Sequence, residues 1–149
     1  MDISQLRTQL ITDEGKRLYV YKDTLNHLTV GVGHLVLPVD HLKADDEISE
    51  EMCNLFLDND IAKAQQACQS LFRGFSTYPE EAQQVLANMA FNLGQTKLGY
   101  FITLRLKAGV RDWLGVATAM EDSTWYHQVG NRAKRLVKRM KAVATTEKG

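Results

Sequence analysis

One long segment constrains the fold more than any other part of this chain: residues 49–72 can form a single unbroken helix. Ser49 is a typical N-cap residue, and Glu50 and Glu51 follow it in the first turn. Apolar side chains then recur at helical spacing, at Met52, Leu55, Phe56, Ile61, Ala64, Cys68, Leu71 and Phe72. A helix of about 23 residues would be about 35 Å long, which suits a connection between two lobes.

The residues before this helix predict a small lobe made of one helix and a β-hairpin. Apolar side chains at helical spacing predict a helix over residues 3–14, which Gly15 would end. Residues 17–21 and 27–33 have the composition of strands, with a turn between them. Residues 35–48 contain a proline and several acids and are expected to be irregular.

Almost everything after the long helix is predicted to be helical. Pro79 opens a helix that Gly94 closes, and shorter helices are expected near residues 97–108, 110–120 and 129–143. We therefore expect a mainly helical α+β fold in one domain, residues 1–149. Its parts are a small lobe (1–48), a connecting helix (49–73) and an all-helical lobe (74–149).

The composition excludes a disulfide scaffold and leaves one cue about partners. Cys53 and Cys68 lack the spacing of metal ligands, fall on the same predicted helix and are expected to be reduced core thiols. The formal net charge is zero, but residues 1–75 carry 7 Lys/Arg against 12 Asp/Glu, and residues 76–149 carry 11 against 6. This asymmetry indicates either a polyanionic partner or attraction between the two halves.

No stretch of the sequence has the pattern of a signal peptide or a membrane span. The first fifteen residues lack a basic start and an apolar core, and no run approaches the ~20 apolar residues that a membrane span needs. We therefore expect no signal peptide and no stable membrane insertion. The basic segment 131–141 carries six Lys/Arg, which suits either the solvated face of a helix or the binding of a polyanion.

Two carboxylates flank the first predicted strand. Glu14 lies in the last turn of a helix, where the helix dipole disfavours negative charge, whereas Asp23 lies in a turn and should stay ionised. Glycoside hydrolysis needs such a pair, one acid to protonate the leaving oxygen and one carboxylate to act on water or the sugar. Thr29 follows on the second strand, where its hydroxyl could hold a water for Asp23. From spacing alone, the alternative is a pair of solvated surface acids and a threonine on an exposed strand face.

The second predicted strand ends in Gly-Val-Gly-His. Gly31 and Gly33 do not form a dinucleotide fingerprint, because the third glycine is missing, and such glycines instead allow a ligand or another backbone to approach closely. His34 could be a metal ligand, but a buried histidine with a hydrogen-bonding partner is favoured, since ligand spacing is lacking. Asp60, four residues after Phe56 on the apolar stripe, is a candidate partner, because a buried aspartate needs one.

The segment "DEGKRLYVYKDTLNHLTVGVGH" (13–34) resembles the active-site hairpin of the phage lysozymes, especially those of the T-even phages. Further matches occur at "NMAFNLG" (88–94) and "STWYHQVGNRAKRLV" (123–137). The three matches follow in the same order and span most of the chain. The resemblance implies a lysozyme-like fold and hydrolysis of the β-1,4 bond between N-acetylmuramic acid and N-acetylglucosamine in peptidoglycan.

The resemblance also implies roles for individual residues in a single-displacement, inverting mechanism. Glu14 would be the general acid, Asp23 the base that directs water, and Thr29 its helper. The remaining implied residues are Leu35 and Phe91, which would line the sugar cleft, and Arg132, His34 and Asp60, which would support it. Arg132 would reach Glu14, and His34 would pair with Asp60. No metal or cofactor is implied, and no substrate contacts are assigned in residues 97–109, where the resemblance slips.

The resemblance further implies a phage endolysin that acts as a monomer on peptidoglycan glycan strands, with no nucleic-acid partner. Such an enzyme would accumulate in the host cytoplasm and reach the periplasm and cell wall through a lesion made by a holin. Two alternatives are a lytic transglycosylase-like relative and a non-catalytic peptidoglycan-binding protein. The presence of Glu14, Asp23 and Thr29 together argues against both.

Overall fold

The structure, a computed structural model, describes residues 1–148 and divides into two compact units. The N-terminal unit is Ile3–Lys63, and the C-terminal unit contains Met1–Asp2 and the chain from Ala64 onward. Helix α2 (Glu50–Leu71) begins in the first unit and ends in the second. The predicted α+β, mainly helical fold is confirmed, because a small antiparallel sheet near the N-terminus is followed by helices.

Helix α1 (Ile3–Glu14) opens the N-terminal unit and has the bounds predicted from the sequence. Leu6 and Leu10 are buried, one turn apart on the same face. Gly15 ends the helix with a φ of 74°, a conformation that glycine adopts without steric cost, and its N–H donates to Ile11 O at 2.9 Å. Glu14 is therefore the last helical residue before the sheet begins.

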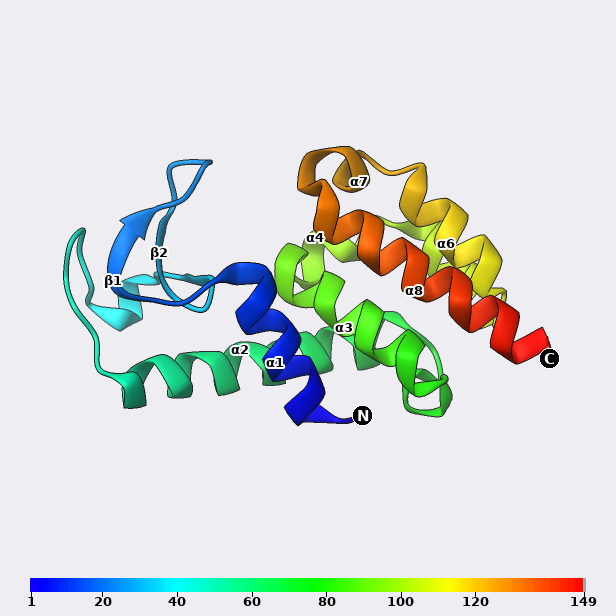
Figure 1. The fold of residues 1–149 in the computed structure, drawn as a ribbon, viewed down its shortest axis with the longest axis horizontal. Coiled ribbons are helices and arrows are strands. Elements are labelled where there is room, and N and C mark those ends of the chain that lie inside the picture. Colours follow the sequence, from blue (N-terminus) through cyan, green and yellow to red (C-terminus); the bar gives the residue numbers. More distant parts are fainter. Residues whose placement is uncertain (149) are drawn as a thin grey trace. The chain divides into compact units, whose positions relative to one another are not determined.

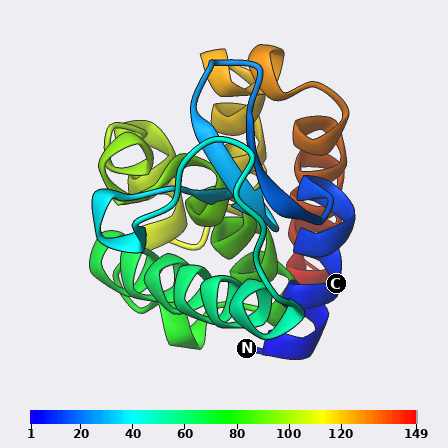
Figure 2. The ribbon, with the colours of Figure 1, turned by 90° about the vertical axis from the view of Figure 1, so that its left-hand side faces the viewer.

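The sheet contains β1 (Arg17–Lys22), β2 (Leu28–Gly31) and β3 (His34–Leu35), antiparallel in that order. The strand predicted over residues 27–33 is therefore too long. It ends at Gly31 because Gly31 and Gly33 have φ values of 65° and 62°, which reverse the chain instead of extending it. His34 consequently begins a third strand, paired with Val30, and does not end the second. Figure 2 shows β1 and β2 side by side.

The segment between β3 and α2 is mostly irregular, as predicted, but it is tied to the sheet. A single 3-10 turn, η1 (Pro38–Asp40), follows β3. The chain then passes back along the outer edge of β1, where Val20 N–H donates to Asp46 O at 2.8 Å and Ile48 N–H donates to Leu18 O at 2.8 Å. These bonds give backbone partners to a strand edge that β2 leaves unpaired.

The long helix α2 begins one residue after its predicted cap. Ser49 Oγ accepts the N–H of Met52 at 3.1 Å, which is the N-cap contact expected for serine. The buried face differs from the predicted stripe, because Met52 and Leu55 are 42% and 62% exposed. The buried positions are Cys53, Leu57, Ile61, Ala64, Ala67 and Cys68. Both cysteines are free thiols, as predicted, and burial raises the pKa of the Cys68 thiol to about 12.

The C-terminal unit is helical throughout its described length, apart from short connections. After the 3-10 turn η2 (Phe75–Thr77), its helices are α3 (Glu80–Leu93), α4 (Gln95–Gly99), α5 (Ile102–Gly109), α6 (Trp113–Glu121), α7 (Thr124–Val129) and α8 (Asn131–Lys148). Residues 82–90 of α3 are all buried. Helix α8 packs beside both α3 and α6, as Figure 1 shows in orange and red. Among the described residues, no helix is long and apolar enough to span a membrane.

The boundaries within this unit are the least well predicted. The opening and closing of α3 at Pro79 and Gly94 are confirmed. The helix expected near 97–108 is divided between α4 and α5. Those expected near 110–120 and 129–143 correspond to α6 and α8, although α8 begins at Asn131 after a separate α7 that was not predicted.

Candidate active site

Glu14 is half-buried at the end of α1, and the backbone of Gly33 lies against its carboxyl group. A methyl group built on Gly33 would lie 2.6 Å from Glu14 Oε1 and 2.7 Å from its Cδ, so any side chain at this position would force the Glu14 carboxyl to move. The sequence predicted that these glycines allow a close approach. At Gly33 the approaching group is the Glu14 side chain, whose carboxyl lies against the backbone of the turn.

Asp23 is anchored by the turn between β1 and β2. Its Oδ1 accepts the backbone N–H groups of Leu25 at 2.9 Å and His27 at 2.8 Å. The hydrogen bond from the His27 backbone lowers the pKa of Asp23, burial opposes this, and the Leu25 bond adds to it, so the pKa lies below its ordinary value. Asp23 is thus an ionised carboxylate near neutral pH, with Oδ2 not used by these two bonds.

Thr29 lies on β2 opposite Tyr21 and is buried, not exposed as the alternative from spacing supposed. Its hydroxyl donates to the backbone carbonyl of His27 at 3.1 Å. Asp23 and Thr29 therefore both bind the backbone of the same residue, the carboxylate on its N–H and the hydroxyl on its C=O. The His27 ring adds a contact of 3.5 Å between Nδ1 and Asp23 Oδ2.

His34 is buried at the start of β3 and has carboxylates on both ring nitrogens. The predicted pairing with Asp60 is present, with 2.7 Å between Nδ1 and Oδ2. Sequence reasoning missed the second partner, Asp40, whose Oδ2 lies 2.9 Å from Nε2. The ring also stacks on Phe56, with centroids 4.1 Å apart and planes 5° apart. Pro38 signalled the start of a helical turn, and acids such as Asp40 are common in a first turn, but neither signal points to His34.

Burial lowers the pKa of His34, but the hydrogen bonds to Asp60 and Asp40 outweigh it, so the pKa lies above its ordinary value. Burial raises the pKa of Asp40, whereas the Leu37 backbone N–H and His34 lower it, and the net direction is downward. Both directions favour an imidazolium facing an ionised carboxylate.

The three remaining predicted site residues, Arg132, Phe91 and Leu35, differ in how deeply they are buried. Arg132 is buried near the start of α8, and its Nε donates to Oδ1 of the fully buried Asn88 at 2.9 Å. Asn88 was not predicted as a functional residue, although it opens the "NMAFNLG" match. Phe91 is half-buried on α3, and Leu35 is 53% exposed on β3. The expected approach of Arg132 to Glu14 stays a prediction.

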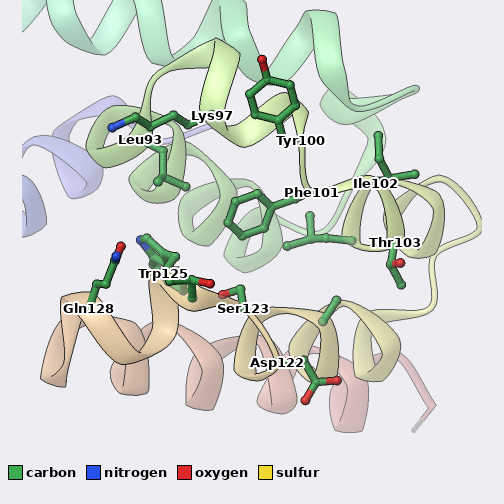
Figure 3. A pocket seen from close by; sticks show the side chains of 13 residues that line it. Leu93, Lys97, Tyr100, Phe101, Ile102, Thr103, Asp122, Ser123, Trp125 and Gln128 are labelled. Atoms are coloured by element: carbon green, nitrogen blue, oxygen red, sulfur yellow. The ribbon is translucent and has the colours of Figure 1, made fainter.

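The C-terminal unit has a hollow of its own, with a volume of about 530 Å³. Figure 3 shows Phe101 and Trp125 pointing into it from opposite sides, with Lys97 and Gln128 at one end and Asp122 near the other. Trp125 is held by a hydrogen bond from its Nε1 to Asn92 Oδ1 at 2.8 Å. None of the predicted site residues lines this hollow. No group of three or more potential metal ligands occurs in the described part of the chain.

The sequence profile of the phage lysozyme family matches residues 12–142, which include the hairpin and both later motifs. The chain belongs to the phage lysozyme family. It is therefore a muramidase-type lysozyme, a glycoside hydrolase whose substrate is peptidoglycan.

The relatives of this lysozyme support its assignment to the family. The chain is 25% identical to probable T4-type lysozyme 1 of Dictyostelium discoideum, over 91% of its own length and 92% of the relative's. It is 30% identical to the pre-baseplate central spike protein Gp5 of Enterobacteria phage T4, over 83% of its own length but only 25% of that protein's. Similarity thus extends to lysozymes of nearly the same length and to one segment of a larger spike protein.

Proposed function

We propose that this lysozyme hydrolyses the β-1,4 bond between N-acetylmuramic acid and N-acetylglucosamine by a single displacement with inversion. Glu14 protonates the leaving oxygen, Asp23 accepts a proton from the attacking water, and Thr29 helps to hold that water. The observation that carries the proposal is the shared anchoring of Asp23 and Thr29 on the His27 backbone. This anchoring gives the pair the fixed geometry that a water-directing base needs.

The hydrogen bonds show which oxygens of Thr29 and Asp23 can still bind the attacking water. Because the Thr29 hydroxyl hydrogen is donated to His27 O, its oxygen is left to accept a hydrogen from water. Asp23 Oδ1 accepts two backbone N–H groups, so Oδ2 accepts the other water hydrogen. The water then points a lone pair at the anomeric carbon. An inverting enzyme needs carboxyl groups about 6.5–9.5 Å apart to leave room for this water.

The remaining candidates have supporting roles in this proposal. Leu35 and Phe91 line the sugar cleft, which suits the exposed apolar surface of Leu35. Arg132, fixed by Asn88, approaches Glu14 and stabilises its charged form after proton donation. His34 and Asp60 hold the turn beside Glu14.

At the level of the cell, we propose that the whole chain acts as a single, monomeric lysozyme domain of a phage endolysin. It accumulates in the host cytoplasm, passes to the periplasm and cell wall through a lesion that a holin makes, and lyses the host. The family membership supports this role. Lysis by the protein added from outside, compared with lysis on expression with and without a holin, tests it.

Digestion of purified peptidoglycan, followed by mass analysis of the fragments, tests the chemistry. Fragments that end in reducing N-acetylmuramic acid are expected. Anhydro ends would show the lytic transglycosylase alternative, which relies on one acid, and release of no fragments would show a binding protein. NMR of the first product decides the stereochemistry, because inversion gives the α anomer first and retention the β anomer.

A further inference from the structure

Asp40 is a charged, mostly buried residue to which the proposed mechanism gives no part. Its side chain is 11% exposed, and its Oδ2 lies 2.9 Å from His34 Nε2 while accepting the Leu37 N–H at 2.8 Å. One oxygen thus ties the beginning of β3 to the chain three residues later. A carboxylate placed this way, with a polar partner in two segments, fixes the geometry of the link between them.

The carboxylates of Asp60 and Asp40, which contact the two ring nitrogens of His34, indicate that the ring is positively charged. An ionised carboxylate only accepts hydrogen bonds, so contacts at both Nδ1 and Nε2 are hydrogen bonds only when both nitrogens carry a proton. The charged groups facing the ring are Asp60 from α2 and Asp40 from η1, and Lys63 acts on Asp40 from α2. The ring is held flat against Phe56 as well. The raised pKa of His34 agrees with this doubly protonated state.

The residue before His34 is the one that supports the candidate acid. A Cβ on Gly33 would displace the Glu14 carboxyl, and on the other side of the turn a Cβ on Gly31 would lie 3.2 Å from Cys53 Sγ. The turn therefore sits in a slot between α1 and α2, with His34 as its anchored end. Movement of His34 would be transmitted to Gly33 through a single peptide bond.

We propose that Asp40 is a positioning residue: with Asp60 it holds the His34 imidazolium, and thereby the Gly33 backbone against which the Glu14 carboxyl rests. When His34 loses a proton, one nitrogen becomes an acceptor facing a carboxylate, and the turn relaxes away from Glu14. The catalytic part of this inference rests on the proposed function, whereas the coupling between His34 and Glu14 does not.

An NMR titration tests the coupling without substrate. In the wild type, the carboxyl carbon of Glu14 should show an additional inflection at the pH where the His34 ring titrates. Asp40→Asn should move the His34 titration and this inflection together, downward by about one pH unit, since one opposing charge is removed. Asp45→Asn is the matched control, because Asp45 is exposed in the same loop with a φ of 70°, which asparagine adopts readily. It should move neither.

The same variants, assayed on soluble peptidoglycan fragments, test the catalytic consequence. The alkaline limb of the kcat profile should shift downward with His34 in Asp40→Asn, while KM changes less than twofold. An alkaline limb that stays in place while the His34 titration moves would overturn the proposal. So would a Glu14 resonance that does not respond to His34 in the wild type, a measurement that needs no variant to fold. A wild type that releases no reducing ends would instead disprove the proposed function and leave the NMR result standing.

Discussion

At the scale of single residues, the candidate acid depends on a residue that has no side chain. Glu14 lies close against Gly33 because its carboxyl group occupies the space that a Cβ on residue 33 would need. The conformation of Gly33 adds a second requirement, since its φ of 62° is unfavourable for other residues by about 1–2 kcal/mol. Gly33 therefore permits the positive φ of the turn and also leaves space for the Glu14 carboxyl.

Comparing Gly33→Ala with Gly74→Ala separates the backbone requirement from the requirement for space beside Glu14. We expect Gly33→Ala to lose about 1–2 kcal/mol of stability from backbone strain and most of its activity, because the new methyl group displaces the Glu14 carboxyl. Gly74→Ala is the control, since Gly74 has a φ of 75° and a Cβ there meets only Thr77 Oγ1 at 3.4 Å. Its stability should fall by a similar amount with activity retained. Equal activity in the two variants would contradict the role of Gly33.

Glu14→Gln tests the acid itself. Glutamine keeps the shape of the side chain but cannot donate a proton to the glycosidic oxygen, so turnover should fall by roughly 10²- to 10⁴-fold. Initial rates on purified peptidoglycan measure the effect, and thermal unfolding should show that the fold survives. Near-normal turnover would remove Glu14 from the mechanism.

At the scale of elements, the sequence predicted the helices whose bounds depend on local periodicity and capping residues. Periodicity and caps located α1, α2 and α3, and the motif pattern singled out Glu14, Asp23 and Thr29. The divisions of the C-terminal helices were missed, although Asp112 and Ser123 cap α6 and α7 with their side chains. The partnership of Asp40 with His34 and the contact between Gly33 and Glu14 were missed because each depends on how the chain folds back on itself, which residue spacing alone does not reveal.

The His34 cluster joins β3, η1 and α2, and its contribution to stability should depend on pH. Because the pKa of His34 is raised, its contribution is complete below about pH 6.5 and is lost as pH rises through the folded-state pKa. Because the pKa of Asp40 is lowered, its contribution is present above about pH 3.9 and is lost as pH falls through the folded-state pKa. The cluster should therefore stabilise most between about pH 4 and 6.5.

Asp60→Asn tests this dependence. Near pH 5.5 we expect a loss on the order of 3 kcal/mol, at the low end for a broken buried pair because 18% of the Asp60 side chain reaches solvent. The loss should shrink as the pH rises above the titration of His34. Urea unfolding of both proteins across this range measures it, and a double-mutant cycle with His34→Gln isolates the pair. A difference that does not change with pH would count against the cluster.

At the scale of the whole molecule, the charge asymmetry seen in the sequence is only partly available to a partner. On α8, Arg139 Nε donates to Glu81 at 2.8 Å and Lys141 lies 2.7 Å from Glu121, so these two cations support packing between helices. Lys134 and Lys138 are exposed on the same helix. The basic segment thus combines a solvated face with internal ion pairs.

Replacing Lys134 and Lys138 by glutamine should slow lysis of anionic cell walls at low ionic strength, because positive charge raises the rate of encounter with a polyanion. Addition of about 0.15 M salt should reduce the difference, since screening then acts over about 8 Å. Activity on a short uncharged chitooligosaccharide is the control and should not change. An equal loss on both substrates would indicate damaged folding instead of lost steering.

The segment that follows η1 has a consequence for self-association. By bonding to Leu18 and Val20, it occupies the outer edge of β1, and the opposite edge of the sheet is the two-residue strand β3. An unpaired strand edge is a template on which a second copy can add its own strand and start an aggregate. Here one edge is already covered and the other is only two residues long, so the sheet offers little template for growth into fibrils.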